Sequence, residues 1–229
     1  MTGVQTCALP ISRLLLLFVL GGLQGALGWF MVESGLQLRT DVSQYRLVAH
    51  LLFALLLYGS ILWTAFGLVW PAPRPLAGTA GLRRHVLVLL ILVIGMLTTG
   101  GFTAGLDGGK IYNTFPLMGG ELVPGDILAH VPLWANPFEN PTTAQFIHRW
   151  LAMIVAATVL ALWLRRGQLP EDARLPLHLV GGMTALQVCL GLSTLLLVVP
   201  IPLAATHQAG AVMLLSLTLF ALHRLRGAR

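Results

Sequence analysis

The sequence predicts an all-α protein, a polytopic membrane helical bundle with six transmembrane helices. Its 229 residues are 56% hydrophobic and only 10% charged, and the mean hydropathy is +0.83. This composition differs strongly from that of a soluble domain. Six apolar segments are long enough to cross a hydrocarbon core about 30 Å thick. They are residues 14–32, 46–70, 86–106, 146–164, 177–199 and 203–222.

Basic side chains are divided unequally between the two sets of segments that connect these helices. One set, with the chain ends, holds Arg13, Arg74, Arg83, Arg84, Arg165, Arg166, Arg174, Arg224, Arg226 and Arg229. The other set holds Arg39, Arg46, Lys110 and Arg149. By the positive-inside rule we expect a bacterial-type inner membrane protein with both ends of the chain cytoplasmic. The net charge of +6 follows from these basic loops, and no soluble basic module is present that would bind nucleic acid.

The domain organisation follows from an internal repeat. Residues 1–12 lack the features of a signal peptide, and we interpret them as a non-native leader. The motif Leu-Gln-x-x-Leu-Gly occurs at 23–28 and again at 186–191, and a helix with a histidine near its outer end follows each copy. We therefore expect residues 13–72 to form the second half of an incomplete N-terminal four-helix unit, and 73–229 to form a complete C-terminal unit. On this hypothesis two further helices precede residue 13.

Two histidines are the main candidates for chemistry. His148 follows a polar loop at the start of one apolar segment, and His207 follows a proline-containing turn at the start of another. Each is therefore about one turn inside the membrane, roughly 5–8 Å below the boundary. Two imidazoles at matching depth on neighbouring helices would ligate a haem iron from opposite faces, with roughly 4 Å between the ligating nitrogens. The alternative is that both are merely polar helix ends.

Other polar residues have more than one interpretation. Arg149 is a candidate to contact a haem propionate, with snorkelling to lipid headgroups as the alternative. His50 is expected to serve a second haem site in the incomplete unit. We expect the long outer loop at 107–143 to be an ordered cap, with a solvated connector as the alternative. The remaining histidines are interpreted as interfacial or solvated; they are His85, His130, His178 and His223.

Four sequence segments carry a resemblance to a known family. GFTAGLDGGKIYNTFPLM at 101–118, QFIHR at 145–149, HQAG at 207–210 and QGALGWFMVESG at 24–35 resemble the haem A synthase family. The resemblance covers residues 13–226. It implies an eight-helix protein of two pseudo-symmetric four-helix halves that oxidises the C8 methyl of haem O to the formyl group of haem A. By this comparison the chain is an N-terminally truncated fragment of such a protein.

The resemblance and the residues together imply the following assignments. Haem b is the cofactor, bound by His148, His207 and Arg149, with the two histidines as iron ligands; His50 is a catalytic iron ligand for haem O. The expected partners are haem O, the lipid bilayer, a haem O synthase and an electron donor, and a homo-oligomer is left open. We expect this chain to retain one haem b without converting haem O.

Two other functions would use the same histidines. One is a bis-histidine di-haem membrane cytochrome that carries electrons, and the other is a non-catalytic haem-handling assembly protein. A carrier holds two haems that do not exchange, whereas a synthase must let one haem enter and leave.

Overall fold

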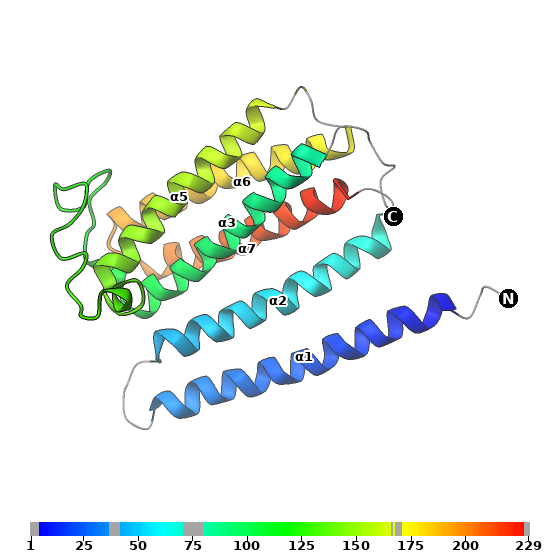
Figure 1. Cartoon of the computed structure of the whole chain (residues 1–229), viewed down its shortest axis with the longest axis horizontal. Coiled ribbons are helices and arrows are strands. Elements are labelled where there is room, and N and C mark those ends of the chain that lie inside the picture. Colours follow the sequence, from blue (N-terminus) through cyan, green and yellow to red (C-terminus); the bar gives the residue numbers. More distant parts are fainter. Residues whose placement is uncertain (1–4, 37–41, 71–79, 166, 168–170, 227–229) are drawn as a thin grey trace.

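The computed structural model describes residues 5–36, 42–70, 80–165, 167 and 171–226, and it confirms the all-α prediction (Figure 1). Six long helices within these ranges are apolar enough to cross a membrane. They are α1 (Gln5–Leu36), α2 (Gln44–Val69), α3 (Ala80–Gly105), α5 (Pro141–Leu164), α6 (Glu171–Leu196) and α7 (Ile201–Arg224). The described residues contain no β-strand, only an isolated bridge between Met118 and Glu121.

All six long helices begin before the residues expected from hydropathy, and two of these differences concern the helices that carry His148 and His207. The side chain of Asn140 accepts hydrogen bonds from the backbone N–H groups of Thr142 and Thr143, and Pro141 needs no N–H partner in the first turn. Helix α5 therefore begins before the predicted residue 146. Helix α7 begins at Ile201 rather than residue 203. Polar residues and prolines in these first turns interrupt the apolar runs on which the prediction depended.

Parts of some predictions lie outside the described residues. Helix α1 begins at Gln5, so residues 5–12 of the predicted leader are helical, while residues 1–4 lie outside the description. Four of the arginines in the two sets of connecting segments also lie outside it; they are Arg39, Arg74, Arg166 and Arg229.

Helices α3, α5, α6 and α7 form a four-helix bundle. Helices α3 and α6 each pack against both α5 and α7, which places α5 and α7 diagonally across the bundle. Buried aliphatic side chains fill its centre; they include Leu89, Val93, Val159, Val180 and Leu215. This packed core fixes the relative positions of the two helices that carry His148 and His207.

Helix α2 packs against α3 and α7, and α1 packs against α2 at the edge of the molecule (Figure 1). Glycines on α3 permit close contact with α2. A Cβ atom added at Gly101 would lie 2.9 Å from Val48, and one added at Gly105 would lie 3.0 Å from the backbone of Gln44. In contrast, none of the residues in the most apolar stretch of α1 is buried within the described structure. An exposed apolar surface of this kind is typical of contact with a membrane or another protein.

The connection between α3 and α5 is an ordered cap at one end of the bundle, as expected (Figure 1). It contains η1 (Gly108–Lys110), η2 (Leu133–Ala135) and the short helix α4 (Asn136–Glu139). The buried side chain of Asn140 donates to the Asp126 carbonyl at 2.8 Å. Tyr45, at the start of α2, donates to the Glu139 carboxylate at 2.6 Å. The cap therefore contacts α2 as well as the bundle.

Candidate functional site

Three histidines occupy equivalent positions near the starts of α2, α5 and α7. With the first residue of each helix counted as one, His50 is seventh, His148 is eighth and His207 is seventh. Each lies about 9–10 Å from its helix start at 1.5 Å per residue. All three are half-buried.

Each of these histidine rings lies against a glycine of the preceding long helix. A Cβ atom added at that glycine would closely approach the imidazole Cε1. The distances are 2.9 Å for Gly28 and His50, 3.1 Å for Gly100 and His148, and 3.0 Å for Gly191 and His207. Because these distances are shorter than a normal van der Waals contact, only glycine lets the ring lie directly on the helix backbone. The pairs α1–α2, α3–α5 and α6–α7 therefore share one arrangement.

A glutamine one turn before the glycine contacts the histidine in two of these pairs. Gln24 Nε2 donates to the His50 carbonyl at 3.1 Å and lies 3.1 Å from Nδ1 and 3.3 Å from Nε2 of the ring. Gln187 Nε2 donates to the His207 carbonyl at 2.7 Å. Within the described residues the buried Nδ1 of His207 has no hydrogen-bond partner. The repeated sequence motif thus corresponds to a repeated contact.

In the third pair, α3–α5, a threonine lies within hydrogen-bond distance of the histidine. Thr99 Oγ1 donates to the Met96 carbonyl at 3.1 Å and lies 3.0 Å from Nδ1 of His148. When the single hydroxyl proton of Thr99 is donated to the Met96 carbonyl, Oγ1 accepts from the Nδ1–H of His148. In this arrangement the lone pair of Nε2 is left for a metal ion.

His148 and His207 lie on α5 and α7, which are diagonal across the bundle, at the eighth and the seventh position of their helices. The expectation that their helices are direct neighbours is wrong, because α5 and α7 each pack between α3 and α6. His50 instead lies between α1 and α2, against Gly28. The described residues contain no group of three or more His, Cys, Asp or Glu side chains placed to hold a metal ion.

Arg149 connects α5 to the cap. Its terminal nitrogens donate to the backbone carbonyls of Tyr112 and Thr114, the latter at 2.7 Å. Gln145, one turn earlier, donates to the same Tyr112 carbonyl at 3.0 Å. The Nε of Arg149 is buried and has no hydrogen-bond partner within the described residues. Arg149 therefore positions the cap over the start of α5, next to His148.

Electrostatics in the cap centre on one carboxylate. The Thr142 hydroxyl donates to Asp126 at 2.7 Å and the Tyr112 hydroxyl donates to it at 3.0 Å. The bond from Thr142, followed by that from Tyr112, lowers the pKa of Asp126 against an opposing effect of burial. The hydrogen bond between Tyr112 and Asp126 also raises the pKa of Tyr112. Asp126 thus links the Tyr112 region of the cap to the first turn of α5.

The other histidines lie elsewhere. His130 and His178 are exposed, as expected, and His85 donates to the Thr158 carbonyl at 3.1 Å. His223 is 0% exposed and its ring centroid lies 5.2 Å from that of Trp63. The interpretation of His223 as solvated is therefore wrong. The sequence of α7 does not reveal this burial, because the aromatic rings that cover His223 belong to α2.

Sequence reasoning missed Thr99 and Gly100. Helix α3 has Met96 at the position that corresponds to the glutamine of the other two pairs, so the repeated motif does not extend to it. The available signal was the polar and glycine-rich segment at 98–101 within an otherwise apolar helix.

Comparisons with known proteins identify the family of this chain. Residues 3–219 match the COX15-CtaA family, described as cytochrome oxidase assembly protein. The chain is 52% identical over 223 residues to a haem A synthase of Granulibacter bethesdensis, which is 95% of this chain and 58% of that protein. Identity is 47% over 212 residues to a haem A synthase of Rhodospirillum centenum, or 92% of this chain and 57% of the relative.

A relative from Bos taurus also matches most of this chain. The chain is 45% identical over 226 residues to the haem A synthase COX15 of Bos taurus, which is 94% of this chain and 54% of that protein. The chain thus spans somewhat more than half the length of the curated relatives it matches. With six helices able to span a membrane, it is a multi-pass membrane protein that belongs to the COX15-CtaA, or haem A synthase, family.

Proposed function

We propose that this chain contributes two haem sites to a haem A synthase, which oxidises the C8 methyl group of haem O to the formyl group of haem A. In this proposal His148 and His207 bind haem b in the four-helix bundle, and His50 binds the iron of the substrate haem O. The relatives named haem A synthase support the activity. The observation that carries the site is that His148 and His207 occupy matching positions on two diagonal helices of one bundle, each against a glycine of an adjacent helix.

The residues of the bundle fit a haem in three respects. Thr99 holds the proton of His148 on Nδ1 and leaves Nε2 as the ligand. The buried Nδ1 of His207 lacks a hydrogen-bond partner within the described residues, which favours a ligand or water at this ring. Gly100 and Gly191 leave no side chain between each ring and the backbone of the adjacent helix.

The role of the cofactor follows from its ligands. A bound haem b supplies reversible one-electron transfer. If His148 and His207 both ligate the iron, the site would be suited to passing electrons rather than to oxidising a methyl group. The two rings pack on Gly100 and Gly191, which would keep both ligands in place.

The substrate site has a different environment. The Gln24 amide lies within hydrogen-bond distance of both His50 ring nitrogens. Gln187 at the corresponding position reaches only the backbone of His207. We infer that Gln24 competes with iron for the His50 ring, which weakens ligation there and permits haem O to enter and haem A to leave.

Arg149 has a second proposed role beside positioning the cap. Its buried Nε remains available for a haem propionate, while its terminal nitrogens hold the carbonyls of Tyr112 and Thr114. Haem O would be supplied by a haem O synthase and electrons by a separate donor, in an inner membrane with the basic loops cytoplasmic.

An exchange experiment tests this function. The full chain is purified in mild detergent, incubated with haem O, washed, and its haems are extracted and separated. We expect haem b to be retained by the unmodified protein and by His50→Ala, and haem O to be lost from His50→Ala alone. Replacement of the exposed His178 with Ala is the matched control. Two haems that never exchange with added haem O would instead support the di-haem electron carrier.

A further inference from the structure

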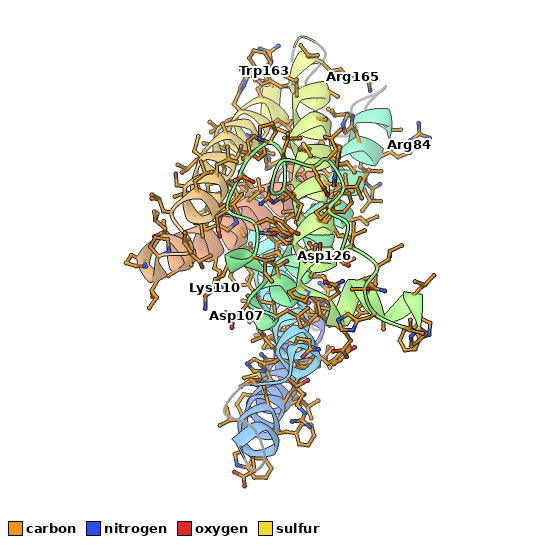
Figure 2. The ribbon with its side chains drawn as sticks, turned by 90° about the vertical axis from the view of Figure 1, so that its left-hand side faces the viewer. Arg84, Asp107, Lys110, Asp126, Trp163 and Arg165 are labelled. Carbon is orange, nitrogen blue, oxygen red and sulfur yellow. The ribbon has the colours of Figure 1, made fainter. Side chains whose placement is uncertain are left out.

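A groove of about 570 Å³ lies between α3 and α5, at the end of the bundle opposite the cap. The start of α3 and the end of α5 form its two walls, since the helices are antiparallel. Its basic end carries Arg84, His85 and Arg165, and its apolar continuation includes Val88, Ile154 and Ala157. Figure 2 shows Arg84 and Arg165 at the end of the bundle away from Asp107 and Lys110.

The length of the groove matches one leaflet of a bilayer. Along α5 it extends from Arg165 to Ile154, which is about 16 Å at a rise of 1.5 Å per residue. Half of a hydrocarbon core about 30 Å thick is roughly the same length. The small side chains of Ala157 and Ala161 leave space for a ligand along this part of α5. An acyl chain therefore fits along the groove.

The charges at the rim favour an anion. Within the described residues neither Arg84 nor Arg165 forms an ion pair, and both are exposed. His85 donates from Nε2 to the Thr158 carbonyl at 3.1 Å, which ties the two walls together beneath the arginines. Two unpaired guanidinium groups above an apolar groove are complementary to a phosphate attached to an acyl chain.

We propose that this groove binds one anionic phospholipid, with its phosphate at Arg84 and Arg165 and one acyl chain along the α3–α5 groove. A zwitterionic lipid is a poorer ligand, because its headgroup cation would lie close to the two arginines. The groove is separate from His148 and His207, which lie toward the other end of the bundle.

Native mass spectrometry of the full chain in mixed lipid and detergent micelles tests the proposal. We expect the protein to retain one phosphatidylglycerol in preference to phosphatidylcholine. Each interfacial arginine contributes about fivefold to affinity, so Arg84→Gln with Arg165→Gln should lower retention about 25-fold. The matched control is Arg83→Gln, because Arg83 is exposed on the same turn but does not line the groove.

A second variant separates the acyl chain from the headgroup. Ala157→Phe narrows the apolar part of the groove without a change of charge and should also lower retention, whereas Leu160→Phe, which is exposed outside the groove, should not. Glycerol phosphate and inorganic phosphate should not displace the lipid. Equal retention of the two lipids, displacement by free phosphate, or a groove filled by a second copy of the chain would each overturn the proposal.

Discussion

The hydroxyl oxygen of Thr99 lies 3.0 Å from Nδ1 of His148 and 3.1 Å from the Met96 carbonyl. When the hydroxyl donates to this carbonyl, it accepts from the Nδ1–H of His148 and leaves Nε2 without a proton. Partners of this kind orient a metal-binding histidine and raise its basicity. Thr99 is therefore a positioning residue for the proposed haem b site.

Replacement of Thr99 with Val removes this partner while it conserves the shape of the side chain. We expect haem b affinity to fall about 10- to 100-fold, with a shift of the midpoint potential, while the fold is retained. Thr98→Val is the control, because the Thr98 hydroxyl bonds only to the Ile94 carbonyl. Haem titration and a potentiometric titration of both variants are the measurements. Identical curves for the two variants would contradict the assignment.

The glycine beneath His148 gives a second prediction. A Cβ atom at Gly100 would lie 3.1 Å from the ring, so Gly100→Ala should displace the imidazole by a few tenths of an ångström. At Gly95, on the same helix, the added atom would lie 3.4 Å from Leu151, which is an ordinary contact. We expect Gly100→Ala to retain less haem per protein than Gly95→Ala in the absorbance spectrum. Equal retention would mean that the close glycine contact does not position the ring.

Arg149 should determine the order of the cap. Replacement of Arg149 with Gln leaves the carbonyls of Tyr112 and Thr114 without their guanidinium donors, so amide hydrogen exchange around residues 112–118 should accelerate. Lys110→Gln is the control. It removes an ion pair with Asp107 in which both side chains are mostly exposed, 58% and 76%, and such pairs contribute little. Faster exchange in the Lys110 variant alone would contradict this role.

Acidification should loosen the same cap. Hydrogen bonds from Thr142 and Tyr112 lower the pKa of Asp126, so the folded cap favours the carboxylate. The contribution of the Asp126 carboxylate to the stability of the cap is complete above the unfolded pKa of about 4. This contribution is lost as the pH falls through the lower pKa of the folded state. Hydrogen exchange of the cap should therefore rise below about pH 4 relative to the helices. Asp126→Asn should abolish this pH dependence, and its persistence in that variant would assign it to another group.

Individual residues show how far sequence alone could lead. The depths of His50, His148 and His207 were predictable in outline because each interrupts an apolar run near its end. The repeated motif also marked Gln24 and Gln187, although only the structure places them against histidines. These predictions depend only on residue patterns within a single helix, and such patterns can be recognised from hydropathy and from the internal repeat.

Features that depend on contacts between helices were not predictable in this way. The diagonal placement of α5 and α7 depends on how four helices pack. The burial of His223 depends on Trp63 of α2, which is remote in sequence. Thr99 was missed because its role depends on a ring that belongs to α5.

The central claim is that His148 and His207 bind one haem b and that His50 does not. The most direct measurement is the reduced-minus-oxidised absorbance spectrum of the purified chain and of three variants, His50→Ala, His148→Ala and His207→Ala. We predict a low-spin bis-histidine spectrum for the unmodified chain and for His50→Ala, and its loss in His148→Ala and His207→Ala. Equal loss of haem in His50→Ala and His148→Ala would contradict the account.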